Sequence, residues 1–402
     1  MTAERHSRAV LAIVGIAVLF AARPSLAQDV AITNARVIVG NGQVINAGTI
    51  IVRGGKIVSA SAGAASAQGL RVIDAKGMSA IPGYIDAHKH VNTGPNEAKE
   101  MQALLEAGYT TILSGGGPGD GNITLRDHIE AGTINGPRII PSERVNLRGT
   151  PDEARAAIRA MAAKGIKHTG EIALTPIPGP TAEEIAVLKA VLDEAAKAGV
   201  QVNVHAVSST AMVAAVDAGV RRLVHLPNKD FTSHEAAAKL ASTGTIALGT
   251  VGFGAPIFGV FAEDNNPRFR DGKPWPEAIA GANRDAAGKA LGTEAAYPIV
   301  NARTIWDHGG LIGYCTDTNY EARAGLEHEL KSYSVMFSMQ DIFKLMGPNT
   351  AAYIGMSDQL GTLEAGKLAD IVLLDGNPLE GIHNMLKTKV VLKGGKIVVD
   401  KR

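Results

Sequence analysis

The stretch "AAKAGVQVNVHAV", residues 195–207, contains in order the three features that decide the fold. An alanine-rich run that favours a helix ends at Gly199, and glycine readily takes the left-handed conformation that closes a helix. The valines that follow are typical of a buried strand. The strand ends on His205, a polar side chain after an apolar run. The stretch therefore predicts a helix, a strand and a candidate functional residue, in that order.

The same order of helix, glycine and strand recurs along the chain. It occurs in "LLEAGYTTILSGG" (104–116), "IEAGTI" (129–134), "AAKGIKHTGEIAL" (162–174), "VDAGVRRLVHLP" (216–227), "ASTGTIALGTV" (241–251) and "WDHGGLIGYCTDT" (306–318). A further strand in "SAIPGYIDAHKH" (79–90) brings the number of strands to eight. Alternation of this kind requires a parallel sheet, and eight units predict an α/β fold of the (β/α)8 TIM barrel type. A doubly wound open sheet is the alternative.

The two flanks of the barrel have a different pattern. Residues 30–60 and 369–402 consist of short alternating strands separated by Asn-Gly and Gly-Gly turns, and both contain "GGKIV". Neither flank has enough strands for a good core alone. We predict that residues 28–80 and 360–402 pair into a small composite β-sandwich, and that residues 81–359 form the barrel.

The composition limits the partners of the chain. The 402 residues include 46% hydrophobic and 20% charged residues, which is typical of a folded globular protein. Lys plus Arg total 40 against 39 Asp plus Glu, without a basic run suited to nucleic acid. We therefore expect a small-molecule substrate and no nucleic acid, and leave a homo-oligomer open. Cys315 is the only cysteine, so a metal site would have to use histidines and carboxylates.

The N-terminal residues 1–27 have the pattern of a signal peptide. Arg5 and Arg8 precede the apolar residues 9–22, and small residues precede Gln28. The apolar run is shorter than the roughly 20 residues of a membrane span. We expect an exported, periplasmic chain without a stable membrane span after cleavage; an uncleaved anchor is the alternative.

The motif "DAHKH" provides the first candidate ligands. Side chains alternate along a strand, so Asp86, His88 and His90 share one face and Lys89 lies on the other. In a barrel that face points inward, and its C-terminal end lines the active-site mouth. His88 and His90 could there hold one metal ion.

Three other strands end in polar residues: His205, His225 in "RRLVHLP", and Asp317 in "CTDT". Four histidines and an aspartate converging on one rim would be costly without a shared ion. A metal centre follows from these five residues.

These motifs resemble the amidohydrolase superfamily, in its imidazolonepropionase and enamidase-like branch, over nearly the whole chain after residue 27. The resemblance rests on "PGYIDAHKH", "CTDT" and the C-terminal "LGTLEAGKLADIVLLDGNPLEGI". It implies a barrel with a composite β-sandwich and two divalent metal ions, most simply Zn²⁺, bridged by a hydroxide. It further implies that His88 and His90 bind one ion, that His205 and His225 bind the other, and that Asp317 contacts both metal and nucleophile.

The residue that bridges the two metals has two candidates. The family usually uses a carboxylated lysine at the end of the fourth strand, and some members use a glutamate. Lys167 and Glu171 share a face of "GIKHTGEIAL". We favour Glu171, because it lies nearer the C-terminal end of the strand and "TGEI" resembles the glutamate-bearing form. Lys167 is the alternative.

The function implied by this site is metal-dependent hydrolysis of a C–N bond in an amide, cyclic imide, lactam, N-acyl compound or carbamate. Asp317 would accept the proton of the nucleophile and pass it to the leaving nitrogen. The alternatives on the same fold are an esterase, lactonase or phosphotriesterase, a mononuclear aminohydrolase, and a binding scaffold without activity.

Two sets of residues are candidates for substrate binding. Arg144 and Arg148, after the third strand, could meet a substrate carboxylate. A long insertion at residues 252–288 contains Phe253, Phe258 and Trp275, and it forms either a lid or a packing element. A lid with these aromatic side chains would favour a partly apolar substrate.

Overall fold

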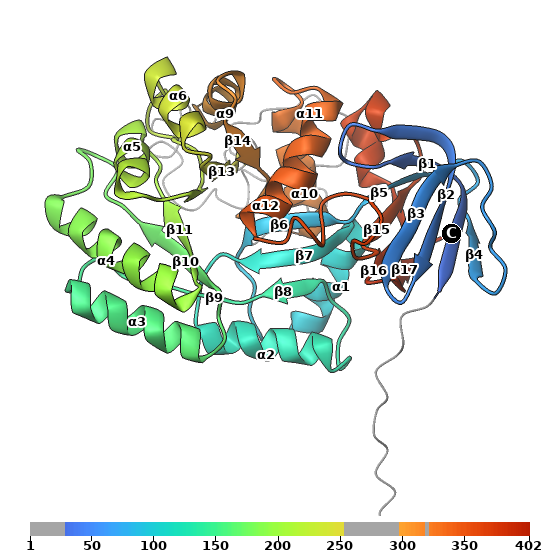
Figure 1. The fold of residues 1–402 in the computed structure, drawn as a ribbon, viewed down its shortest axis with the longest axis horizontal. Helices are drawn as coiled ribbons and strands as arrows, with labels where there is room; N and C mark the ends of the chain where they lie inside the picture. The colour runs from blue at the N-terminus through green and yellow to red at the C-terminus, as the bar shows by residue number, and fades with distance from the viewer. Residues whose placement is uncertain (1–28, 253–296, 318–320) are drawn as a thin grey trace, which may run out of the picture.

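A computed structural model describes residues 29–252, 297–317 and 321–402 (Figure 1). The expected signal peptide and the aromatic residues Phe253, Phe258 and Trp275 lie outside the described residues. The strands of the barrel region are β6 (Tyr84–Lys89), β7 (Tyr109–Ser114), β8 (Arg138–Ile140), β9 (Ser142–Glu143), β10 (His168–Ala173), β11 (Gln201–His205), β12 (Arg222–Val224), β13 (Ile246–Leu248) and β14 (Leu311–Gly313).

These strands form a closed ring of parallel neighbours. Strands β6, β7 and β8 pair in that order, and β9 to β14 pair in sequence order. Strands β8 and β9 are consecutive parts of one strand interrupted at Pro141. The ring closes where the amide of Ala87 in β6 donates to the carbonyl of Tyr314 at the end of β14 (3.2 Å). The predicted (β/α)8 barrel is confirmed, and the open-sheet alternative is wrong because an open sheet would leave β6 and β14 as unpaired edges.

Glycine closes the helices of the repeat as the sequence predicted. All seven glycines that define the motif have φ between 65° and 108°: Gly108, Gly132, Gly165, Gly199, Gly219, Gly244 and Gly309. Gly199 is the left-handed C-cap of its helix, and its amide donates to the carbonyl of Ala195. Each glycine therefore ends one helix and lets the chain turn into the next strand.

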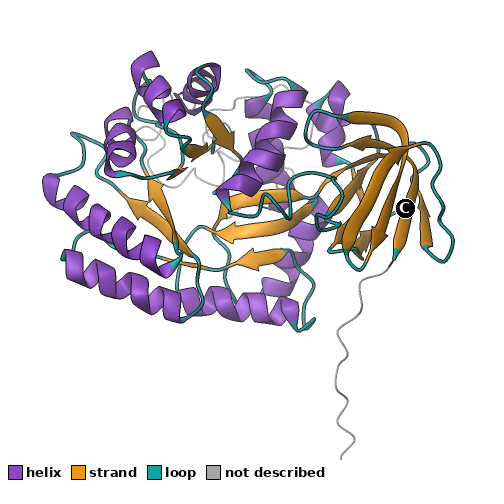
Figure 2. Ribbon diagram, in the orientation of Figure 1, coloured by secondary structure: helices purple, strands orange, loops and turns teal. Residues whose placement is uncertain are grey.

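The helices cover the outside of the ring (Figure 2). Helices α3 and α4 begin with capping boxes at Thr150 and Thr181, in which threonine and a glutamate three residues later satisfy each other's amides. The described helices are α1 (Glu97–Ala107), α2 (Gly119–Glu130), α3 (Pro151–Ala163), α4 (Ala182–Ala198), α5 (Ser209–Ala218), α6 (His234–Ser242), α9 (Tyr297–Asp307), α10 (Ala322–Tyr333), α11 (Met339–Lys344), α12 (Thr350–Tyr353), the short π-helix η2 (Leu345–Asn349), and the short 3-10 helices η3 (Pro378–Glu380) and η4 (Ile382–Leu386).

The two flanks of the chain share one sheet beside the barrel (Figure 1). Its N-terminal strands are β1 (Val30–Ile38), β2 (Val44–Arg53), β3 (Lys56–Ala62), β4 (Arg71–Asp74) and β5 (Ser79–Pro82), and its C-terminal strands are β15 (Ile371–Leu374), β16 (Thr388–Lys393) and β17 (Lys396–Asp400). Strand β5 joins the two sets, pairing with β1 on one side and β15 on the other. Ile32, Ile73, Ile371 and Val390 are among the buried residues of its core. The prediction that both ends build one small β unit is confirmed.

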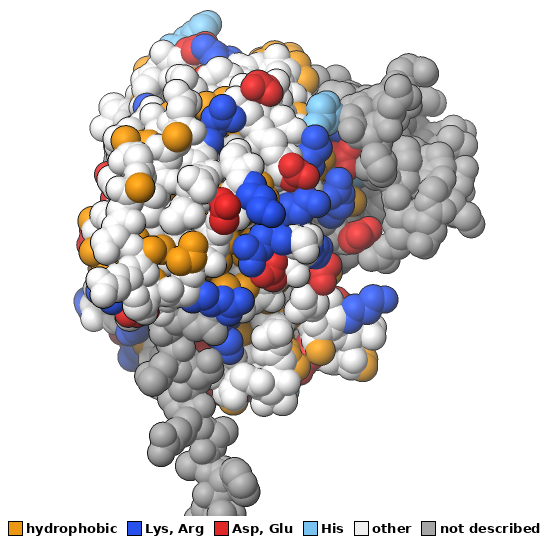
Figure 3. Space-filling view, turned by 90° about the vertical axis from the view of Figure 1, so that its right-hand side faces the viewer, with side chains coloured by type: hydrophobic (Ala, Val, Ile, Leu, Met, Phe, Trp, Pro, Cys, Tyr) orange, Lys and Arg blue, Asp and Glu red, His pale blue; other side chains and the backbone are white. Residues whose placement is uncertain are grey.

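The surface at this end of the molecule carries charges of both signs. Figure 3 shows basic side chains gathered among acidic ones on the face that lies to the right in Figure 1. Ion pairs of the flank sheet include Arg53 with Asp29 (3.1 Å) and Arg402 with Asp400 (2.7 Å). Within the described residues, no helix has the length and apolar character needed to cross a membrane.

A buried histidine of the barrel should make the stability depend on pH. Burial, followed by the charge of Arg222, lowers the pKa of His168 from 6.5 to about 4. Between these values the unfolded chain binds a proton that the folded chain does not, so stability falls as the pH falls through this window. This group alone should lower the free energy of unfolding by about 2 kcal/mol from pH 7 to pH 5.

Urea unfolding of the wild type and His168→Gln at both pH values checks this expectation. The variant should lose less stability on acidification than the wild type. His234→Gln, at an exposed histidine, is the control and should follow the wild type. Equal pH dependence of His168→Gln and the wild type would contradict the assignment.

Candidate metal centre and active site

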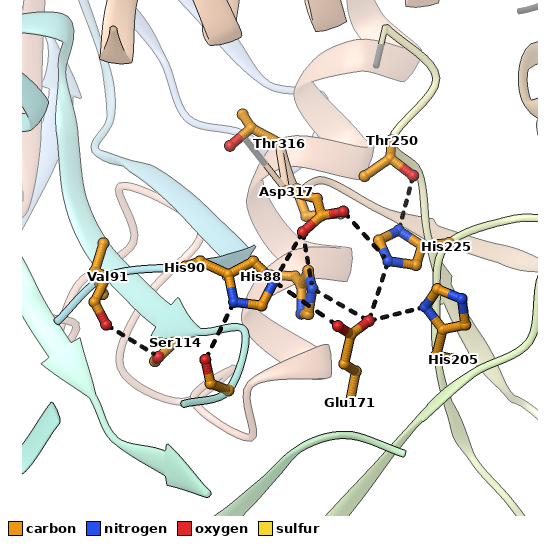
Figure 4. A network of polar contacts seen from close by, with 12 residues as sticks. His88, His90, Val91, Ser114, Glu171, His205, His225, Thr250, Thr316 and Asp317 are labelled. Carbon is orange, nitrogen blue, oxygen red and sulfur yellow. Dashed lines mark hydrogen bonds and ion pairs between the residues drawn. The ribbon is translucent and has the colours of Figure 1, made fainter. Parts of the chain in front are cut away.

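The candidate ligands come from five strands of the ring and meet at the carboxyl ends of these strands (Figure 4). His88 lies in β6 and His90 directly follows it, Glu171 lies in β10, His205 ends β11, His225 follows β12, and Asp317 follows β14. The ring centroids of His205 and His225 lie 4.7 Å apart, and the ring centroid of His88 lies 5.1 Å from those of both His90 and His225. The structure thus brings all six residues predicted as metal ligands into one cluster.

Asp317 contacts the histidines of the first pair. Its Oδ1 lies 3.2 Å from Nε2 of His88 and 3.1 Å from Nε2 of His90. Its Oδ2 lies 3.5 Å from Nε2 of His225. The carboxylate therefore spans three imidazoles.

Glu171 lies between the two histidine pairs. Its Oε2 is 2.8 Å from Nδ1 of His205 and 3.4 Å from Nε2 of His225. Each carboxylate oxygen also lies 3.8 Å from one histidine of the other pair: Oε2 from His88 and Oε1 from His90. A carboxylate in contact with all four histidines has the position that a bridging ligand requires.

The two bridging candidates differ in their placement. Lys167 precedes β10, is exposed, and its carbonyl accepts a hydrogen bond from the amide of Gln201. Glu171 is mostly buried and lies inside the cluster. The geometry favours Glu171.

The far sides of the histidine rings are also anchored. Nδ1 of His90 is 3.1 Å from the carbonyl of Gly116, which makes this nitrogen the donor and directs Nε2 to the cluster. Nδ1 of His225 is 2.9 Å from the hydroxyl of Thr250. These partners fix the rings in the orientation that a metal ligand needs.

Asp86 supports the segment that carries His88 and the segment that carries Asp317. Its carboxylate accepts hydrogen bonds from the amide of His88 (3.1 Å) and from the amide and hydroxyl of Thr316 (3.1 and 2.6 Å). Burial, opposed mainly by the charge of Lys89, raises the pKa of Asp86 to about 6. Asp86 thereby ties β6 to the segment that carries Asp317. The sequence placed Asp86 on the same face as His88 but did not reveal this role, and it gave no signal for Gly116 or Thr250.

Two of the ligand candidates have strained backbones. His225 has φ of 66° and Asp317 has φ of 48°, a region that side chains other than glycine seldom occupy. Such strain costs of the order of 1–3 kcal/mol and is concentrated at functional sites. Strain at two residues of one cluster indicates that the surrounding structure imposes this backbone conformation, which places both side chains in the cluster.

The electrostatics of the cluster favour ionised carboxylates. Burial raises the pKa of Asp317 and of Glu171, but the histidines outweigh it and hold both pKa values well below their usual range. The contacts with His88 and His90 lower the pKa of Asp317, those with His205 and His225 lower the pKa of Glu171, and the charges of His88 and His225 act on both carboxylates. The contact with Asp317 in turn raises the pKa of His90. Both carboxylates are therefore available as anionic ligands at neutral pH.

These residues fit divalent metal ions. Two groups of three have their ligand atoms within 4.8 Å of one another: His88 with Glu171 and His225, and His88 with His90 and Asp317. His88 is 3% exposed, and its Nε2 has no hydrogen-bond partner among the described residues although it points at both carboxylates. Imidazole nitrogens and carboxylate oxygens are typical zinc ligands, and a buried imidazole nitrogen that faces two carboxylates without a hydrogen bond is an atom that an ion would satisfy.

The candidate substrate-binding arginines lie in different surroundings. Nη2 of Arg144 is 3.2 Å from Oε1 of Glu171, so Arg144 reaches the cluster. Arg148 is exposed, and its amide donates to the side chain of Asn146. No contact joins Arg148 to the cluster among the described residues. The lid or packing role of residues 252–288 concerns a segment of which only Gly252 is described.

A closed (β/α)8 barrel with polar residues converging at the carboxyl ends of its strands defines the class of barrel enzymes. The model of the amidohydrolase family matches residues 79–241 and 290–398. The chain belongs to the amidohydrolase family, and the predicted resemblance is confirmed.

Individual relatives agree with this assignment. An imidazolonepropionase from Caldanaerobacter subterraneus subsp. tengcongensis is 24% identical, with 87% of this chain and 90% of that protein covered. An N-acyl-D-aspartate deacylase from Alcaligenes xylosoxydans xylosoxydans is 32% identical over 42% of this chain, and the match spans only 35% of that protein. The crystal structure of a putative prolidase from Bifidobacterium longum superposes with a TM-score of 0.77, at 24% identity, covering 94% of this chain and 97% of that one. That likeness shows the shared fold.

Proposed function

We propose that this amidohydrolase uses two divalent metal ions, most simply Zn²⁺, to hydrolyse a C–N bond of a small, partly apolar substrate such as an amide, cyclic imide, lactam, N-acyl compound or carbamate. The observation that supports this most directly is the cluster of four histidines and two carboxylates, in which the buried Nε2 of His88 faces both Asp317 and Glu171. Relatives named as a deacylase and an imidazolonepropionase support the choice of C–N bonds.

The residues divide into two sites that share Glu171. His88, His90 and Asp317 would hold one ion, His205 and His225 the other, and Glu171 would contact both. Ions bound there would lower the pKa of a water molecule toward neutrality and polarise the substrate carbonyl.

Asp317 is the residue best placed to move protons. An aspartate is ionised at neutral pH, so Asp317 can accept the proton of the attacking water. The same carboxyl group can then donate that proton to the leaving nitrogen, because the amine is a far stronger base than the carboxylate. His90 and His225, both in contact with Asp317, hold the carboxylate in place during the two transfers.

Metal analysis tests this proposal. The purified protein should contain about two divalent ions per chain by elemental analysis. A chelator should abolish hydrolysis of a panel of amides, imides, lactams and N-acyl compounds, and added Zn²⁺ should restore it. Metal loading should also raise the Tm, since the ions bind the folded chain.

A different number of metal ions bound per chain would decide between the alternative functions. One ion per chain with deaminase activity would support a mononuclear aminohydrolase and contradict the proposal. If no ion were bound after incubation with zinc, the proposal would be wrong and a binding scaffold without activity would be the remaining alternative.

A further inference from the structure

Arg144 has an unusual position for a surface arginine. It follows β9, its Nη2 lies 3.2 Å from Oε1 of Glu171, and its side chain is 59% exposed. One part of the guanidinium thus contacts the candidate bridging ligand while more than half of the side chain remains accessible to solvent. A group bound at the metal centre could therefore reach Arg144 directly.

The backbone around Arg144 is built to admit its side chain. A Cβ atom on Gly116 would lie 3.1 Å from Cγ and 3.3 Å from Nε of Arg144, and one on Gly170 would lie 3.3 Å from Cγ. All three distances are tighter than ordinary contacts, and a Cβ on Gly170 would also lie 2.8 Å from Cα of Gly116, so the two glycines let this backbone and the arginine side chain pack closely. Gly116 also accepts from His90, and Gly170 precedes Glu171. The arginine is therefore positioned by the same segments that position the ligands.

The charge of the site favours an anion beside Arg144. Two divalent ions would bring four positive charges, of which Glu171, Asp317 and a bound hydroxide would compensate three. Arg144 adds a further positive charge next to Glu171. A guanidinium at such a place is stabilised by a carboxylate, which it can bind with two parallel hydrogen bonds.

We propose that Arg144 binds a carboxylate of the substrate, so that the preferred substrates are N-acyl amino acids or peptides with a free carboxylate close to the scissile C–N bond. This inference rests on the proposed function and narrows its substrate class. It makes Arg144 a specificity-determining residue. It does not extend to Arg148, although both arginines were candidates for carboxylate binding from the sequence alone.

The test uses matched pairs of compounds. N-acetyl amino acids of L and D configuration are compared as free acids and as primary carboxamides on the metal-loaded protein. The wild type should prefer the free acid. Arg144→Gln should lower kcat/KM for the acid by about 10- to 100-fold, with a loss at least about tenfold larger than for the carboxamide. Arg144→Lys should recover part of the loss, and Arg148→Gln is the control that should behave as the wild type.

Binding provides a second readout that does not depend on turnover. In protein with Asp317→Asn, which should hydrolyse slowly, calorimetry gives the dissociation constant of the N-acetyl amino acid. Adding Arg144→Gln should raise that constant about 10- to 100-fold without changing the metal content.

The outcomes separate this inference from the proposed function. Equal hydrolysis of acids and carboxamides by the wild type, or equal losses in Arg144→Gln, would overturn the carboxylate site while leaving the hydrolase intact. Equal losses together with fewer bound metals would instead make Arg144 a positioning residue for Glu171. No hydrolysis and no bound metal in the wild type would reject the proposed function itself.

Discussion

Asp317→Asn should lower kcat by about two to four orders of magnitude while the protein retains its metal ions. An asparagine side chain keeps an oxygen that can act as a ligand, but it cannot accept the proton of the attacking water or return it to the leaving nitrogen. The carboxylate is needed as an anion, which is the form of an aspartate at neutral pH. Steady-state kinetics at neutral pH and elemental analysis of the same sample measure the two quantities.

The matched control is Asp307→Asn. Asp307 is an exposed aspartate on α9 that forms an ion pair with Arg303, and the same change of charge there should leave kcat and metal content as in the wild type. A kcat of Asp317→Asn within about threefold of the wild type, at equal metal content, would remove Asp317 from the proton transfer. Loss of the metals would show that Asp317 acts chiefly as a ligand.

Glu171→Gln should reduce the metal content from about two ions per chain to one or fewer. The glutamate oxygens lie 2.8 to 3.8 Å from nitrogens of all four histidines, so the carboxylate compensates the repulsion between two neighbouring cations. A neutral amide cannot do this. The loss of metal affinity should exceed the roughly 10- to 100-fold effect of changing an outer-shell partner. Chelator competition followed by elemental analysis measures this affinity.

Two controls make this experiment specific. Glu143 lies in the neighbouring strand β9 and its carboxylate pairs with Lys164. The protein with Glu143→Gln should therefore keep both ions. Lys167→Gln removes the alternative bridging ligand, and it should also keep both ions. If Lys167→Gln lost metal while Glu171→Gln retained it, a carboxylated Lys167 would be the bridge and our assignment would be wrong.

The repeat and the strand ends could be predicted because they depend on local properties of the chain. Glycine after an alanine-rich helix has a conformational reason to be there, and the structure gives each of these glycines a positive φ. Alternation along a strand likewise puts His88 and His90 on one face. The parallel repeat then directs the ends of all strands to one rim, so His205, His225 and Asp317 follow from topology.

The supporting contacts could not be predicted because their partners are distant in sequence. Asp86 accepts a hydrogen bond from the hydroxyl of Thr316, which lies 230 residues further along the chain. Nδ1 of His225 contacts the hydroxyl of Thr250, which follows another strand. Threonine and aspartate side chains make many kinds of local contact in strands and loops. No spacing rule therefore identifies Asp86 or Thr250 as a residue that supports the cluster. Only the closure of the ring between β6 and β14 places Asp86 beside the segment of Asp317.

The sequence by itself predicted the class of fold and the polar residues at the strand ends, since both follow from periodicity, glycine positions and residue identity. The tertiary structure supported the preference for Glu171 over Lys167 by placing Glu171 inside the cluster, and it alone distinguished Arg144, which reaches the cluster, from Arg148. The physical reason is that each choice depends on where a side chain ends in space. Alternation assigned Glu171 and Lys167 to the same face, but the depth of each residue along the barrel axis and the close packing of Arg144 against Gly116 and Gly170 exist only after the ring has closed.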